Sequence, residues 1–282
     1  MSHTQQFVSL FFKRARSLKK GLSLPQTISR ASGLSLHRRK VSNLGDIKAC
    51  PCDYVPFLKE FAPMEISHWQ KDIDISHLPV IVGGGGLFSN QYFERQLTHV
   101  VRSRPRSLIC WGAGQNTHDS TVVRFPEILK SFDLVGVRDH DSPFDWVPCA
   151  SCLDPAFDRS YTKKHEIVLY NHSEFRVLQN DGFPEMTNAV RDFGEVIAFL
   201  ASGDTVITTS YHGAYWATLL GRRVIVLNPF SSKFFAFRHP PVLASDEDWR
   251  SALLAARSFP GALDECRKSN HQFAAKVLDR IT

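Results

Sequence analysis

The sequence predicts an α/β fold built on parallel sheets, and three stretches carry that prediction. Residues 204–233 contain a β-branched run at 205–209, an apolar stretch of helical length that ends at Gly221, and an apolar run at 224–227. A strand, a helix and a second strand in this order build a parallel sheet. Strand-like apolar runs that end in glycine at 78–86 and 107–114 indicate that the same pattern occurs earlier in the chain.

Length, charge and cysteine content indicate which kinds of protein this chain can be. The 282 residues suit one large α/β domain or two of modest size. Nine Lys or Arg and no acidic residue lie within residues 1–40, which leaves 25 basic against 28 acidic residues in the remainder. This remainder lacks the main electrostatic support for binding nucleic acid, so we expect no nucleic-acid partner. No run approaches the roughly 18 apolar residues of a membrane span, and the six cysteines fit a cytoplasmic protein with reduced thiols.

Residues 1–40 are predicted to be a basic arm and linker. The apolar run Phe7–Phe12 leads directly into a cluster of Lys and Arg at 13–20. Three interpretations stay open: a peripheral contact with the anionic inner face of a membrane, a solvated arm, or an organelle transit peptide. The Ser, Gly and Leu content of residues 21–35 is typical of a linker, so the folded body is expected to begin near Val41.

Two loops of the first half have the composition of ligand-binding turns. Asn43 and Asp46 flank a glycine, as in a polar ligand loop or an ordinary turn. The strand at 78–82 ends in Gly83–Gly86, whose backbone can approach a phosphate or carboxylate closely; a purely structural turn is the alternative. The glycine turn matches neither a P-loop nor a dinucleotide fingerprint.

The rest of the first half adds a cation and two cysteine pairs. Helical spacing at 122–132 precedes a strand at 134–137, after which Arg138 is placed either to bind an anion or to pair with neighbouring aspartates. The pairs Cys50/Cys52 and Cys149/Cys152 either supply zinc thiolates or are buried and loop thiols, and their wide separation favours thiols.

The second half repeats the α/β pattern. A strand at 166–170 precedes His172, which we interpret as a loop histidine, and a long helix is predicted at 184–202. His212 follows the strand at 205–209, at the strand end where ligands bind in open α/β sheets. The aromatic segment 234–239 is expected to cover a cleft, and helices at 244–257 and 263–278 close the chain.

With these motifs in order, the chain resembles the polysaccharide pyruvyl transferase family. The features that match are Asn43-x-Gly-Asp46, Val82 to Phe88, Trp111-Gly-Ala-Gly114, Val137-Arg-Asp139 with Ser142, Val147-Pro-Cys149, Val206-Ile-Thr-x-x-x-His212-Gly213 and Lys233. The resemblance implies two Rossmann-like domains facing a central cleft, as in GT-B glycosyltransferases, which we place at 41–159 and 160–282.

The same resemblance implies a reaction. The donor is phosphoenolpyruvate, the acceptor is a pair of sugar hydroxyls on a surface glycan or its lipid-linked precursor, and the product is a pyruvate ketal. No metal or organic cofactor is implied. His212 becomes the general acid, and Asn43 and Asp46 are expected to orient donor or acceptor. The expected donor-binding residues are Gly84, Gly85, Gly86, Arg138, Ser210, Tyr211, Ser232 and Lys233.

One position departs from the family pattern. Many members carry arginine two residues before the histidine, where this chain has Ser210. Arg222, Arg223 and Arg238 are candidates to replace that cation. Two other functions stay open: a nucleotide-sugar glycosyltransferase of similar two-domain shape, and, because of Ser210, a non-catalytic glycan-binding relative that lost donor binding.

Overall fold

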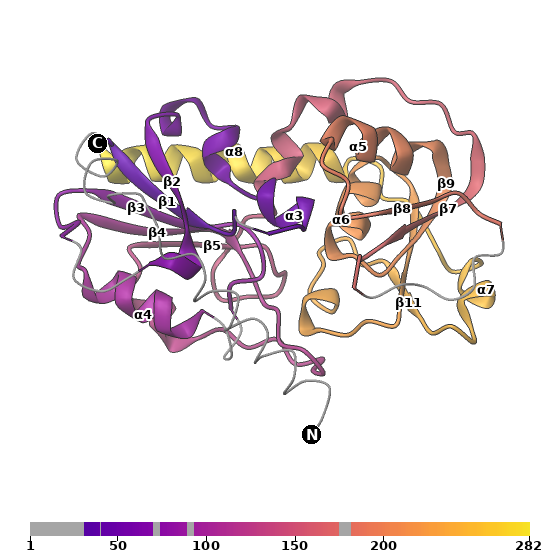
Figure 1. Cartoon of the computed structure of the whole chain (residues 1–282), viewed down its shortest axis with the longest axis horizontal. Helices are drawn as coiled ribbons and strands as arrows, with labels where there is room; N and C mark the ends of the chain where they lie inside the picture. The colour runs from indigo at the N-terminus through magenta and orange to yellow at the C-terminus, as the bar shows by residue number, and fades with distance from the viewer. Residues whose placement is uncertain (1–30, 40, 70–73, 89–92, 175–181) are drawn as a thin grey trace. The chain divides into compact units, whose positions relative to one another are not determined.

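Two parallel β-sheets organise the computed structural model (Figure 1), which describes residues 31–39, 41–69, 74–88, 93–174 and 182–282. Chain contacts separate residues 1–31 from a unit formed by residues 32–282, and both sheets lie in the second unit. The predicted α/β fold with parallel sheets is confirmed. The limits of the two expected domains stay a prediction.

The first sheet has the strand order β2-β1-β3-β4-β5-β6, and every pair is parallel. Both central strands, β3 and β4, are buried along their whole length, as expected for a parallel sheet covered on both faces. Figure 1 shows α4 and α8 on opposite sides of this sheet. The strands are β1 (Gly33–His37), β2 (Phe61–Glu65), β3 (Pro79–Gly83), β4 (Ser107–Ala113), β5 (Leu134–Val137) and β6 (Asp145–Trp146), and the α-helices of this half are α3 (Leu44–Ile47) and α4 (Glu94–Arg102).

The second sheet has the order β11-β10-β9-β7-β8 and is also parallel throughout. Its core is aromatic: Trp216 of α6 meets Phe193 of α5 edge to face, with ring centroids 4.9 Å apart. All nine residues of α6 are buried, so this helix lies within the core rather than on the surface. The elements are β7 (His165–Asn171), β8 (Glu185–Thr187), α5 (Phe193–Ser202), β9 (Gly203–Thr208), α6 (Tyr211–Leu219), β10 (Arg223–Leu227), β11 (Val242–Ala244), α7 (Trp249–Ala252) and α8 (Ala262–Ile281).

The last helix, α8, joins the cores of the two sheets. Its first turns, with Ala262 and Cys266, belong to the core around α6, whereas Phe273 and Val277 pack into the core of the first sheet. Between them Asn270 is fully buried; its Oδ1 accepts a hydrogen bond from the indole of Trp111 at 2.9 Å. The predicted helix at 263–278 is confirmed, and its burial explains how the end of the chain stabilises strands near its beginning.

Two predicted boundaries are wrong. The folded body begins at Gly33 rather than near Val41, because residues 33–37 pair with both β2 and β3 and are buried. The helix predicted at 184–202 starts only at Phe193, where the Asp192 side chain accepts a hydrogen bond from the Glu195 amide and caps the helix. Residues 185–187 form β8 instead.

Two further helices are shorter than predicted. The helical spacing at 122–132 forms only a 3-10 helix at Glu127–Ser131, which follows the extended N-cap residue Pro126. Proline disfavours a helical conformation of the residue before it, so the helix does not extend back toward 122. The helix predicted at 244–257 reduces to α7, because residues 242–244 pair with β10 as strand β11.

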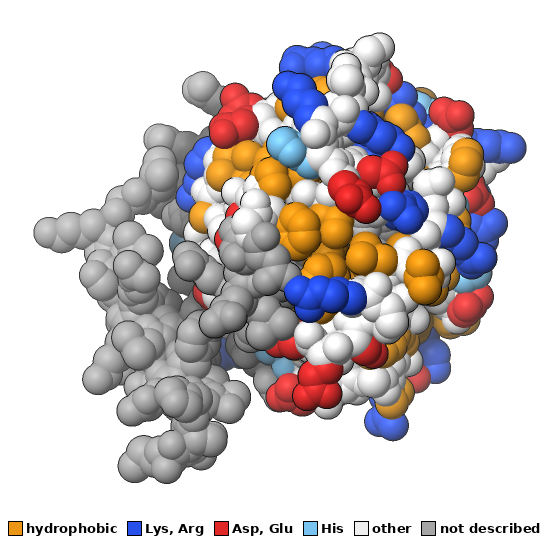
Figure 2. Space-filling model, turned by 90° about the vertical axis from the view of Figure 1, so that its right-hand side faces the viewer, with side chains coloured by type: hydrophobic (Ala, Val, Ile, Leu, Met, Phe, Trp, Pro, Cys, Tyr) orange, Lys and Arg blue, Asp and Glu red, His pale blue; other side chains and the backbone are white. Residues whose placement is uncertain are grey.

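The predicted basic arm lies almost wholly outside the described residues, since 1–30 and 40 are not described. Within the described ranges, no helix is long and apolar enough to cross a membrane. On the face in Figure 2, which lies on the side of the second sheet, the described Lys and Arg side chains alternate with Asp and Glu around a hydrophobic patch. The described positive and negative side chains are therefore mixed on this face and form no large patch of one charge.

Candidate functional site

The predicted site residues all follow strands of the two sheets at their carboxyl ends. Loop 116–119 after β4 and loop 230–232 after β10 are joined directly. Ser232 N donates to Thr117 O at 2.9 Å, Thr117 N donates to Ser232 Oγ at 3.0 Å, and Asp119 N donates to Phe230 O at 3.1 Å. These bonds bring the ligand-binding edges of both sheets to one place.

His212 lies in the first turn of α6 and is 4% exposed. Its imidazole packs between Gly45 of α3 and the Trp216 ring, whose centroid is 5.2 Å away. A side chain at Gly45 would collide with the imidazole Nδ1. Among the described residues Nε2 has no hydrogen-bond partner. Burial holds the pKa of His212 well below its usual range, and the positive charges of Arg138 and Lys233 lower it further.

Arg138 follows β5 and is 3% exposed. Its guanidinium carbon lies 3.9 Å from the centroid of the Tyr211 ring, and one terminal nitrogen donates to Gln115 O at 3.1 Å. Its Nε has no partner among the residues that the structure describes. The expected alternative, an ion pair with neighbouring aspartates, is not formed within the described ranges. Arg138 is therefore a buried cation that lies on an aromatic face without a salt bridge, although its charge acts on the buried carboxylate of Asp139.

Lys233 lies in the short 3-10 helix Ser232–Phe234 after β10. Its Nζ stands 4.4 Å from the centroid of the Phe230 ring. Loss of solvation and, to a smaller extent, the charge of Arg138 lower the pKa of Lys233 to about 7, against the opposing effect of Asp46. Its amine is thus poised to gain or lose a proton near neutral pH.

The glycine turn contributes backbone groups. Gly84 and Gly85 have φ values of +75° and +79°, in the left-handed region that glycine adopts without strain. Gly84 N donates to Trp111 O, whereas the amides of Gly85 and Gly86 have no acceptor within the described part of the chain. A Cβ at Gly85 would lie 3.2 Å from Asp46 Oδ1, so the turn closely approaches α3.

Three predicted ligand residues use their polar atoms to hold the backbone. Asn43 Oδ1 accepts from Gly45 N at 3.0 Å and caps α3. Ser210 Oγ accepts from Gly213 N at 3.3 Å and caps α6, and Ser232 Oγ accepts from Thr117 N. These side chains position the loops that carry Gly45, His212 and Lys233. Their roles in donor binding stay predictions.

None of the three arginines considered as substitutes for the family cation reaches His212. Arg223 pairs with Asp204, with Nη2 and Oδ2 at 2.7 Å, at the amino end of β10. Arg222 stands beside it, at the opposite end of α6 from His212. Arg238 pairs with Glu265 at 2.5 Å. The cations whose charges act on His212 are Arg138 and Lys233.

The sequence reasoning missed His118. It lies in the loop after β4, with its ring 5.6 Å from that of Phe230 and edge to face with it. His172, interpreted as a loop histidine, meets the same Phe230 ring at 6.1 Å. Burial and the charge of Lys233 lower the pKa of both imidazoles, to about 4 for His172. The signal available in the sequence was the place of His118, a few residues beyond the end of a buried strand.

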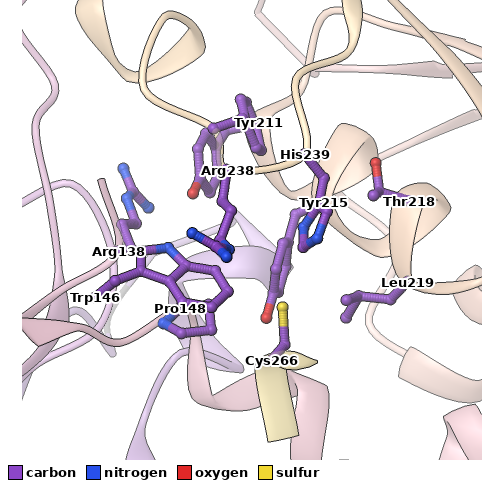
Figure 3. Close-up of a pocket in the computed structure, with 11 residues that line it drawn as sticks. Arg138, Trp146, Pro148, Tyr211, Tyr215, Thr218, Leu219, Arg238, His239 and Cys266 are labelled. Carbon is purple, nitrogen blue, oxygen red and sulfur yellow. The ribbon is translucent and has the colours of Figure 1, made fainter. Parts of the chain in front are cut away.

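A small cavity of about 20 Å³ lies beside Arg138 and Tyr211 (Figure 3). Figure 3 shows the Arg238 side chain extending toward Trp146, and the guanidinium carbon is 5.1 Å from the centroid of that ring. Phe237 closes the region by stacking on Tyr211 at 4.6 Å. The cavity has room for about one water molecule, so it does not hold a substrate. The segment 234–239 contacts the aromatic face that supports Arg138.

Comparisons with known proteins place the chain in a family. Residues 40–232 match the family model of the polysaccharide pyruvyl transferases. Among solved structures, a protein of Klebsiella pneumoniae described as functionally uncharacterised is similar, with 14% identity and a TM-score of 0.43 over 80% of this chain and 90% of the other. No curated protein matches the chain. Since the family model covers well over half of the sequence, the chain belongs to the polysaccharide pyruvyl transferase family.

Proposed function

We propose that this protein transfers the pyruvyl group of phosphoenolpyruvate to two hydroxyls of a sugar in a surface glycan or its lipid-linked precursor, forming a cyclic ketal. One observation carries the proposal: two cations, Arg138 and Lys233, lie close enough to the buried His212 for their charges to act on it, and neither forms a salt bridge with a carboxylate of the described residues. Family membership supports a transferase that acts on a glycan.

The charges of the site favour a multiply charged anion. Arg138 is buried and Lys233 is partly buried, and two such cations that repel one another are stabilised when opposite charge enters. Phosphoenolpyruvate carries both a phosphate and a carboxylate, and the guanidinium of Arg138 suits either group. The amides of Gly85 and Gly86 and those of the first turn of α6 can donate hydrogen bonds to the phosphate oxygens.

His212 can serve as the acid only after the donor binds. Its pKa in the protein alone lies well below 6.5, so the imidazole is neutral at pH 7. The negative charges of phosphoenolpyruvate would raise this pKa because an adjacent opposite charge favours the protonated form. Donor binding therefore favours a protonated His212 imidazole next to the bound phosphoenolpyruvate, where the general acid is needed.

The reaction balances with these groups. A proton from His212 adds to the methylene carbon of the enol phosphate, and one sugar hydroxyl attacks C2 of the resulting cationic centre. The bond between C2 and the phosphate oxygen breaks, and the second hydroxyl closes the ketal. One of the two hydroxyl protons restores His212, and the other leaves on phosphate. Arg138 and Lys233 would stabilise the departing phosphate.

Calorimetry tests the donor. We expect heat of binding with phosphoenolpyruvate and none with UDP-glucose or GDP-mannose, whereas the reverse would indicate a glycosyltransferase. Binding of neither would favour a non-catalytic relative.

In a ketal-formation assay followed by mass spectrometry, His212→Ala should lose activity while His77→Ala, an exposed residue away from the site, keeps it. Ketal formation by His212→Ala would overturn the assigned acid role.

We also propose that the basic segment at residues 1–30 binds anionic membranes, on the basis of its charge and its apolar run. Because β1 starts at Gly33, a truncation at residue 30 spares the first sheet. Co-sedimentation with vesicles that contain phosphatidylglycerol should be lost after this truncation. Equal sedimentation of the full and truncated chains would contradict the proposal.

A further inference from the structure

An open cavity of about 390 Å³ lies next to the candidate site and has no role in the donor arrangement described above. Its volume falls in the range of about 300–1,000 Å³ common for small-molecule sites. The lining residues come from two loops: Asp119, Ser120, Thr121 and Val122 after β4, and Pro229 and Phe230 after β10. Each sheet therefore contributes one wall.

The two walls are fixed to one another. Besides the backbone bonds of Thr117 and Asp119, Ser231 Oγ donates to Asn116 Oδ1 at 2.9 Å. Asp119 and Asn228 both have positive φ values, 54° and 46°. Asparagine and aspartate adopt this conformation more readily than other non-glycine residues, and Asn228 directly precedes the wall formed by Pro229 and Phe230. The hydrogen bonds between the two loops fix the walls of the cavity relative to one another.

The lining chemistry suits a carbohydrate. Phe230 and Val122, which is 50% exposed, offer apolar surface to the faces of a sugar ring. Asp119, Ser120 and Thr121 offer a carboxylate and two hydroxyls to its hydroxyl groups. An apolar platform with a few polar groups is the usual composition of a small-molecule site.

One lining residue, Phe230, also contacts a proposed donor-binding residue. Lys233 Nζ lies 4.4 Å from the centroid of the Phe230 ring, and the charge of Lys233 reaches His212. We infer that this cavity, between the loops 119–122 and 229–230, is the subsite for the acceptor sugar, which packs on Phe230 with its reacting hydroxyls directed toward Lys233. The direction of the hydroxyls rests on the proposed function. His118 and His172 flank the Phe230 ring.

Saturation-transfer NMR with methyl glycosides of glucose, galactose, mannose, N-acetylglucosamine and N-acetylmannosamine tests the subsite. We expect signals from ring protons of at least one glycoside, and their loss in Thr121→Trp, which fills the cavity from an exposed position. Phe230→Ala should lose them too. Phe235→Ala, which removes a 40%-exposed ring outside the cavity, should keep them. Thermal unfolding of each variant checks that it folds.

Calorimetry with phosphoenolpyruvate on the same samples separates the two proposals. Donor binding without any glycoside signal, or glycoside signals that persist in folded Thr121→Trp, would overturn the subsite and leave the donor assignment intact. Glycoside signals lost in Thr121→Trp, without donor binding in the wild type, would support the sugar site and overturn the proposed donor.

Discussion

The imidazole of His212 packs directly on Gly45, leaving no room for a Cβ at that position. The two residues come from α6 and α3 and lie far apart in the sequence. The contact explains the glycine between Asn43 and Asp46: it allows a helix of the first sheet's region to approach the histidine closely. The motif therefore acts through its smallest residue as well as through its polar ones.

Gly45→Ala should displace the His212 ring and lower ketal formation by about tenfold or more, because small misplacements of a reacting group reduce rates strongly. Overpacking should also cost about 1–3 kcal/mol of unfolding free energy. Steady-state kinetics and urea unfolding measure the two effects. Gly194→Ala in α5 is the matched control and should keep full activity. Wild-type kinetics in Gly45→Ala would show that the contact is unimportant.

Donor affinity should fall as pH rises above 7. The pKa of Lys233 is about 7, and a bound anion favours its protonated form. Above pH 7 binding must then take up a proton, which weakens affinity by up to about tenfold per pH unit. Calorimetry at pH 7 to 9 in buffers of different ionisation enthalpy measures this uptake. Lys233→Arg stays charged and should flatten the dependence; an unchanged slope would assign the proton to another group.

Lys233→Met should abolish donor binding and raise the unfolding free energy by about 0.5–2 kcal/mol. Substitutions that remove an unfavourable group from a binding site commonly stabilise a protein by this amount. The pKa of Lys233 is lowered from 10.5 on folding, so folding releases its proton at pH values between about 7 and 10.5. The destabilisation is therefore complete below pH 7 and disappears toward pH 10.5. Urea unfolding between pH 7 and 10.5 should show that the stability gained by Lys233→Met declines as the pH rises.

The matched control for this experiment is Lys130→Met, which removes an exposed lysine paired with Glu127. It should change the unfolding free energy little at any pH, because exposed ion pairs contribute only about 0–1 kcal/mol. A destabilised Lys233→Met would mean that the contact of Nζ with the Phe230 ring outweighs the burial of its charge.

Ser210→Ala should lower the unfolding free energy by about 0.5–2 kcal/mol, the usual loss for a helix N-cap. Ser210→Asn should keep most of this stability because asparagine caps equally well. Ser210→Arg restores the family residue but removes the cap, so we expect lower stability without tighter donor binding. Tighter phosphoenolpyruvate binding by Ser210→Arg would show that the site lacks a cation that Arg138 and Lys233 do not supply.

Much of the fold followed from the sequence alone. Apolar runs of strand length that end in glycine predicted β3 and β4, and a β-branched run predicted β9, because burial on both faces of a parallel sheet requires continuous apolar segments. β1 was missed since Gly-Leu-Ser-Leu-His also has the composition of a linker. Its neighbours β2 and β3 decide its state, and they are distant in the sequence.

For the candidate site, strand-end placement in the sequence singled out the glycine turn, Arg138 and His212, and the resemblance to the family added Lys233 to this set. Only the tertiary structure decided what each group does there. Packing assigned Ser210, Asn43 and Ser232 to backbone hydrogen bonds, and it brought His118 to Phe230. The burial of Arg138 and His212, and the effect of the Arg138 and Lys233 charges on His212, depend on distances between two sheets, which no local pattern encodes.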